Sequence, residues 1–72
     1  MTVEELLPGI AADGYLVNNL FQRDAELWQA NLRRGDACAA FAMGYSPAEA
    51  LQAAWERMRR EHPPTPKKDF FA

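Results

Sequence analysis

The sequence has little of what a disulfide-stabilised fold or a metal site requires. Cys38 and His62 are the only cysteine and the only histidine among the 72 residues. One cysteine cannot form an intramolecular disulfide, and one thiol with one imidazole is too small a ligand set for a structural zinc site. A chain of this length buries only about 60 per cent of its unfolded surface, so its stability is expected to be marginal. Self-association would supplement so small a core, and a homodimer is therefore one of the predicted states.

Residues suited to catalysis are equally scarce. His62 stands beside Pro63 and Pro64, and no serine or cysteine near it in the sequence could serve as a nucleophile. Cys38 lies in an apolar segment, where a thiol is more often a small buried hydrophobe than a reactive group. The chain also has no glycine-rich phosphate-binding loop, and nothing in it suggests two carboxylates held in a cleft. We therefore expect a protein that is not an enzyme and that uses no cofactor or metal.

The chain has no excess of basic charge. Its 8 basic and 10 acidic residues give a net charge of −2. Sequence-independent binding to nucleic acid depends on a basic excess. Positive charge does gather in residues 57–68. One interpretation is an ordinary helix end, whose arginines interact favourably with the negative end of the helix dipole; the other is a patch that contacts phosphates. The balance there is five basic residues minus one acidic residue, or +4: Arg57, Arg59, Arg60, Lys67 and Lys68 against Glu61.

Long apolar runs and a secretion signal are also missing. No stretch approaches the roughly 20 apolar residues that a membrane-spanning helix needs. Glu4 and Glu5 stand where a signal peptide would have its basic region. A cytoplasmic protein is therefore expected, and a single reduced thiol is compatible with that location.

The clearest feature that is present is a helix over residues 46–61. Ser46 can accept a hydrogen bond from the Glu49 amide while Glu49 reaches back to the Ser46 amide, and Pro47 suits the first helical position. Proline at 63 and 64 ends the helix, because a residue before proline is pushed out of the α region. The spacing predicts one apolar stripe along the helix, made of Ala50, Leu51, Ala54, Trp55 and Met58.

Strand patterns precede this helix. Residues 15–22 are rich in aromatic and branched side chains, and residues 26–33 alternate between apolar and polar. Residues 23–25 are expected to connect these two strands, and a tight turn at 34–36 leads into a third strand at 37–43. One face of the second strand would carry Trp28, Ala30 and Leu32, and the other Gln29, Asn31 and Arg33. In the third strand Ala39, Phe41 and Met43 would share one face, and Cys38, Ala40 and Ala42 the other.

An all-α bundle is the alternative. The third strand is rich in alanine, the best helix former and a poor strand former. Asp24 and Asp36 could serve as N-caps and Gly35 and Gly44 as C-terminal glycines, giving short helices at 25–34 and 37–43. Helices this short are marginal in isolation and would need a core that the chain can hardly supply.

The predicted fold is therefore α+β, a three-stranded antiparallel meander packed by one long C-terminal helix. The helix stripe would cover one face of the sheet, to which Trp28, Leu32, Phe41 and Met43 are expected to point. At the N-terminus, Thr2 and Glu5 form a second capping box, but Pro8-Gly9 is expected to interrupt it, leaving a short helix or turn. That segment would lay Leu6, Leu7 and Ile10 over one edge of the core. Residues 1–62 would form a single domain, followed by a proline-rich tail at 63–72.

One arrangement of residues resembles a known group of proteins. It resembles the strand-strand-helix ending of small phage and prophage accessory proteins. The residues that carry the resemblance are Trp28 and Leu32-Arg33, followed by a hairpin turn, then Gly44-x-Ser46-Pro47 and Ala50-Leu51. The likeness spans residues 28–54. That group is similar in size to anti-CRISPR and other host-takeover inhibitors. The resemblance implies a small non-enzymatic protein that binds a host protein and occludes its surface.

These observations predict where a partner would bind. Arginine and tyrosine often anchor protein interfaces, and the exposed strand face and the start of the helix are expected to present them. Arginines at the helix end would add electrostatic steering. The alternatives are a nucleic-acid-binding regulator that uses the basic helix end, and a structural homo-oligomer. The predicted partner-binding residues are Gln29, Asn31, Arg33, Arg34, Tyr45, Arg59 and Arg60.

Overall fold

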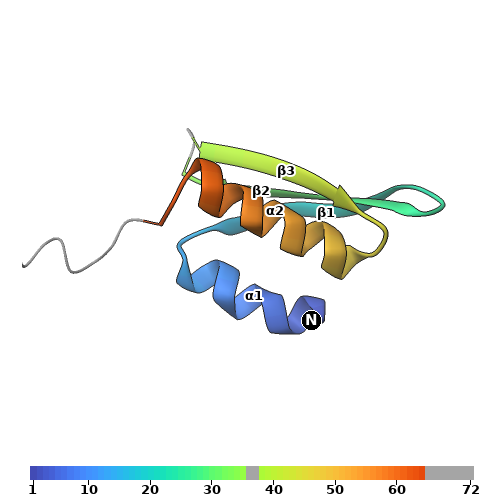
Figure 1. Ribbon diagram of the computed structural model, residues 1–72, viewed down its shortest axis with the longest axis horizontal. Helices are drawn as coiled ribbons and strands as arrows, with labels where there is room; N and C mark the ends of the chain where they lie inside the picture. The colour runs from blue at the N-terminus through green and yellow to red at the C-terminus, as the bar shows by residue number, and fades with distance from the viewer. Residues whose placement is uncertain (36–37, 65–72) are drawn as a thin grey trace, which may run out of the picture.

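The computed structural model describes residues 1–35 and 38–64 as two helices and a sheet. The strands pair antiparallel in the order β1-β2-β3, and both helices lie on one side of them (Figure 1). The predicted α+β fold is thus confirmed, and the all-α alternative is wrong. Parts of two predictions fall outside the described residues: positions 36–37 of the turn and third strand, and positions 65–72 of the proline-rich tail. In chain order the elements are α1 (Val3–Ala12), β1 (Leu16–Asp24), β2 (Leu27–Arg34), β3 (Cys38–Gly44) and α2 (Pro47–Glu61).

Helix α2 begins and ends where its sequence signals predict. The Ser46 hydroxyl accepts a hydrogen bond from the Glu49 amide over 3.1 Å, which is one half of the expected reciprocal pair, and Pro47 is the first helical residue. At the other end His62 is the C-cap, directly before Pro63. The buried face of α2 consists of Ala50, Leu51, Ala54 and Met58, all without exposed surface. Burying this stripe against the sheet is what makes the helix stable in so small a domain.

Helix α1 differs from its prediction because it continues through Pro8 and Gly9. Both halves of its capping box form: the Glu5 amide donates to Thr2 Oγ1 over 3.2 Å, and the Thr2 amide donates to Glu5 Oε1 over 2.8 Å. The bond from the Thr2 amide lowers the pKa of Glu5. Pro8 removes one backbone donor from the helix, but tertiary packing compensates for that loss.

The packing that sustains α1 comes from Trp55 of α2. A Cβ atom at Gly9 would overlap the Trp55 ring, so glycine is required for the two helices to approach. Trp55 Nε1 also donates to Asp13 Oδ2 over 2.9 Å, just beyond the end of α1. Trp55 therefore packs on α1 rather than covering the sheet as expected. Leu6 and Ile10 are buried in this contact as predicted, but Leu7 is 41% exposed and does not join them.

The side chains of β3 point in the opposite direction from the prediction. Ala40 pairs with Leu32 and Ala42 with Ala30, so the alanines share the sheet face that α2 covers. Phe41 and Met43 face away from the helix and are 43% and 42% exposed. Small side chains under α2 let the helix lie close to the sheet, which explains why this strand is rich in alanine.

The β1–β2 hairpin extends past the start of α2 (Figure 1). Strand β1 runs two residues further than predicted, to Asp24, whereas β2 starts one residue later than predicted, at Leu27. Ala25 and Glu26 form the turn, where Asp24 Oδ1 accepts from the Glu26 amide over 3.2 Å. Because the hairpin projects beyond the helices, β1 is exposed along most of its length.

Tyr15 ties the start of the sheet to the end of α2. Its side chain is 1% exposed, and its hydroxyl donates to the His62 carbonyl over 2.6 Å. The Arg34 guanidinium lies 6.0 Å from the centre of the Tyr15 ring and donates to the Pro63 carbonyl over 2.6 Å. Tyr15, directly before β1, and Arg34, at the end of β2, thus hold the chain where α2 ends.

We expect this contact to make the protein sensitive to alkali. Burial raises the pKa of Tyr15 above its value in the unfolded chain, which is about 10. Stability contributed by the neutral phenol is therefore complete below about pH 10 and is lost as pH rises towards the folded-state pKa. Tyr15→Phe should lower the free energy of unfolding by about 1 kcal/mol near neutral pH, and it should remove part of the alkaline decline. Urea denaturation across alkaline pH measures both, with Tyr45→Phe as the exposed control; equal declines in the two variants would contradict the assignment.

Candidate functional site

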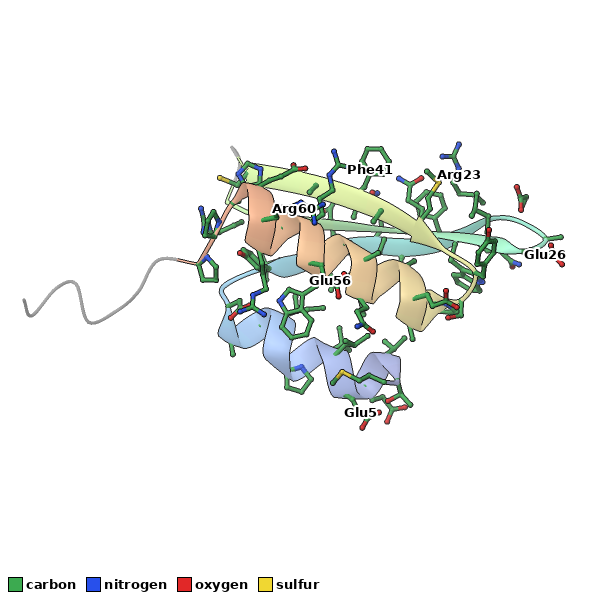
Figure 2. All side chains as sticks on the ribbon, viewed as in Figure 1. Glu5, Arg23, Glu26, Phe41, Glu56 and Arg60 are labelled. Atoms are coloured by element: carbon green, nitrogen blue, oxygen red, sulfur yellow. The ribbon has the colours of Figure 1, made fainter. Side chains whose placement is uncertain are left out.

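The side of the sheet opposite the helices presents side chains from all three strands. Directly paired residues in an antiparallel sheet share a face, so the register assigns the side chains. Figure 2 shows Arg23 and Phe41 rising from the side of the sheet away from α1 and α2. We call this surface the outer face; it consists of Leu16, Asn19, Phe21, Arg23 and Asp24 of β1, Leu27, Gln29, Asn31 and Arg33 of β2, and Ala39, Phe41 and Met43 of β3.

A chain of side-chain hydrogen bonds crosses the outer face. Arg23 Nη1 donates to Gln29 Oε1 over 3.1 Å, and Gln29 Nε2 donates to Asn31 Oδ1 over 2.9 Å. Asn31 Nδ2 in turn donates to Asn19 Oδ1. Four polar side chains from β1 and β2 are therefore held in fixed orientations, which lowers the entropy cost of presenting them to a partner.

Large apolar side chains lie on β1 and β3, the strands on either side of Gln29 and Asn31. Leu16 and Phe21 of β1 are 55% and 40% exposed, and Phe41 and Met43 of β3 are exposed to a similar degree. Single exposed apolar residues are common, but four on one sheet face form a patch of the kind that marks interaction sites.

A shallow hollow of about 280 Å³ lies in the outer face between β1 and β3. Ala39 forms part of its floor, because its small side chain leaves space beside Phe41. Asn18, Asn31 and Arg33 supply the polar part of the lining. The hollow has the chemistry to hold one partner side chain with a polar or acidic end.

The edges of the sheet are less open than the outer face. At the β3 edge, Arg57 of α2 donates to the Phe41 carbonyl over 2.9 Å, and its guanidinium lies 5.4 Å from the centre of the Phe41 ring. Arg57 also pairs with Glu61 over 2.7 Å, and this hydrogen bond lowers the pKa of Glu61. At the β1 edge, the register shifts around Asn18 and Arg23. Charged groups and bulges at sheet edges discourage pairing with another strand, so contact through the face is favoured.

The seven predicted partner-binding residues do not form one surface. Gln29, Asn31 and Arg33 lie on the outer face as expected. Tyr45 is 76% exposed at the connection between β3 and α2. Arg34 is a correction: its pair with Cys38 puts it on the helix side of the sheet, where it holds the end of α2.

The two predicted steering arginines lie on α2, away from the outer face. Arg59 lies 3.4 Å from Asp13 Oδ2 and 5.8 Å from the centre of the Trp55 ring, so it helps to join α2 to α1. Arg60 is exposed near the end of the helix (Figure 2). Neither shares a surface with Gln29, Asn31 and Arg33.

Only Gln29, Asn31 and Arg33 of the outer face were predicted as partner contacts. Phe41 and Met43 were instead predicted to point towards α2 as part of the core. Leu16, Phe21 and Arg23 were not identified because no face was predicted for the first strand, in which register shifts change which residues share a face. The only available signal was the alternation within β3, which groups Phe41 with Met43 correctly but does not say which face is covered.

The described residues offer no cluster of three or more histidine, cysteine, aspartate or glutamate side chains that could hold a metal ion. Cys38 is half-buried, and its sulfur lies 3.8 Å from Arg34 Nη2. Within residues 1–35 and 38–64, neither helix has the length and apolar character needed to cross a membrane.

No family model, curated protein or solved structure matches the chain. The resemblance to phage accessory proteins thus stays a prediction, and the argument for function depends on the surface itself.

Proposed function

We propose that the protein is a small non-enzymatic binding protein, an inhibitor or adaptor of the phage type, that covers a surface of a host protein with its outer face. This proposal depends mainly on the exposed apolar side chains of the outer face. Leu16, Phe21, Phe41 and Met43 lose contact with water only when something covers the sheet, and burying a large apolar side chain contributes roughly 1.5–3 kcal/mol.

The ordered polar row supports the same function. Exposed amide side chains usually move freely, whereas Gln29 and Asn31 are linked to each other and to neighbouring strands. A partner would meet polar groups whose orientation is already set, so less entropy is lost on binding. Apolar residues around a fixed polar centre give affinity and specificity together.

The phage-type assignment and a cytoplasmic location belong to this proposal. They are supported by the small α+β fold, by the strand-strand-helix ending over residues 28–54, and by the single thiol of Cys38. A host protein is therefore the expected partner.

The proposal is tested by capturing proteins from a bacterial lysate on the tagged full chain. Leu16→Ser should reduce recovery of the captured partner by about fivefold or more, because it places a polar group in the apolar patch. Leu7→Ser is the matched control, since Leu7 is also an exposed leucine but lies on α1. Equal recovery with both variants would show that the partner binds elsewhere.

A further inference from the structure

The polar row on the outer face has a fixed direction. An arginine side chain only donates hydrogen bonds, so the atom of Gln29 that faces Arg23 must be its oxygen. The Nε2 group of Gln29 then points to Asn31 Oδ1, and Asn31 Nδ2 in turn points to Asn19 Oδ1. Each amide in the row has one orientation, because the donor at the start of the row allows no other.

The polar row ends on a donor. Asn19 uses its oxygen to accept from Asn31, so its Nδ2 group is left at the end of the row, and this group donates to none of the described residues. Aligned hydrogen bonds polarise one another, which adds to the partial positive charge of the last N–H groups. Asn19 is exposed. A partner that covers this position therefore meets a hydrogen-bond donor whose orientation is already set.

Apolar side chains lie before and after this donor on the outer face of β1. They are Leu16 and Phe21, which are 55% and 40% exposed. A partner group that reaches Asn19 loses water to these neighbours, and that loss costs an ionised carboxylate far more than a neutral oxygen. The outer face also carries charges of both signs, with Asp24 next to Arg23, so its charge does not favour an ionised partner.

We propose that the outer face binds a protein segment in which an uncharged oxygen acceptor, a backbone carbonyl or a side-chain amide, lies between large apolar side chains. The acceptor would bind Asn19 Nδ2, and the apolar groups would cover Leu16 and Phe21. Arg23 is a positioning residue, since it determines the direction of the polar row from the other end. This proposal deepens the proposed function by naming the chemistry of the partner, and it rests on that function.

The direction of the polar row is tested on the isotope-labelled full chain alone. One Gln29 Nε2 proton and one Asn31 Nδ2 proton should exchange with water at least about threefold more slowly than the Asn19 Nδ2 protons, because hydrogen bonding protects them. Arg23→Glu places an acceptor at the start of the row, so each amide should turn over and one Asn19 proton should become protected. Arg60→Glu, the same charge change at an exposed position on α2, should leave Asn19 unprotected. Protected Asn19 protons in the wild type would overturn the proposal.

Binding is tested with peptides selected from a displayed random library on the immobilised full chain, keeping those that no longer bind Leu16→Ser. The most enriched of these peptides should bind about tenfold more weakly to Asn19→Asp, which keeps an oxygen for Asn31 but replaces the outward donor by an acceptor. The loss should persist in about 1 M salt, where charges more than about 3 Å apart are screened. Gln52→Glu is the matched control, because it makes the same exchange at an exposed position on α2, and its affinity should equal that of the wild type.

The outcomes separate this proposal from the broader one. A peptide that depends on Leu16 but binds Asn19→Asp as tightly as the wild type would overturn the acceptor while leaving protein binding by the outer face in place. A loss that disappears in high salt would overturn the uncharged acceptor in favour of a carboxylate. Selection of no peptide that depends on Leu16 would overturn the proposal, whereas the proposed function fails only if capture of the partner does not depend on Leu16.

Two other occupants of the outer face would give different results. Dimers in sedimentation that are abolished by Leu16→Ser would overturn the proposal in favour of a second copy of the chain. Retardation of a mixed-sequence single-stranded RNA that is lost in Arg23→Glu would overturn it in favour of nucleic acid.

Discussion

Gly44→Ala is expected to lower the free energy of unfolding by about 3 kcal/mol, which is most of the stability that a domain of this size has. A Cβ atom at Gly44 would lie 2.5 Å from the Ala50 amide nitrogen and 2.8 Å from the carbonyl carbon of Glu49. These are backbone atoms in the first turn of α2, so they cannot move aside as the end of a flexible side chain could. The helix would have to shift off the sheet, and urea denaturation monitored by circular dichroism measures the loss.

Gly35→Asn is the control for this substitution. Gly35 has a φ of +67°, a conformation that asparagine tolerates better than most residues, and no atom lies within 4 Å of a Cβ placed there. The variant should remain close to the wild type in stability. If Gly44→Ala were as stable as Gly35→Asn, the close approach of α2 to the end of β3 would be wrong.

Leu51→Ala is expected to destabilise the protein by about 2–5 kcal/mol. Leu51 has no exposed surface and lies in the stripe of α2 that forms the centre of the core. Truncating it removes buried apolar contacts and leaves a cavity that the rigid neighbouring elements cannot fill completely. Gln52→Ala, at the next position but exposed, should change stability by less than about 0.5 kcal/mol. Thermal unfolding of both variants measures the difference, and equal melting temperatures would contradict the assigned orientation of α2.

The long helix could be predicted from the sequence because its signals are local. Ser46, Pro47 and Pro63 determine where α2 begins and ends, whatever the rest of the chain does. The alternation in β2 likewise places Ala30 and Leu32 on the covered face correctly. These features depend on neighbours in the chain, and such neighbours are visible in a single sequence.

The orientation of β3 could not be predicted because it depends on the distance between α2 and the sheet. Hydrophobicity alone assigns Phe41 and Met43 to the core, but the space under the helix admits only small side chains such as Ala40 and Ala42. Gly9 has a similar role between the helices, where a close contact with Trp55 outweighs its unfavourable helix propensity. In each case the deciding fact is a distance between elements far apart in the sequence.

The same limitation explains why the candidate site was only partly predicted. Polar residues of β2 were assigned to the exposed face correctly, since alternation is regular within that strand. Arg34 was expected in the exposed turn at 34–36, but it is the last residue of β2, and because adjacent residues in a strand point to opposite faces its side chain lies on the helix side, opposite Arg33. The apolar part of the outer face depends on strand register, which composition does not determine.

The central claim is that the outer face of the sheet binds the partner. Its most direct test is the amount of partner recovered by the Leu16→Ser variant divided by the amount recovered by Leu7→Ser, with both variants shown to be folded by circular dichroism. The account predicts a ratio below about one fifth. A ratio near one, with the partner still captured, would contradict it.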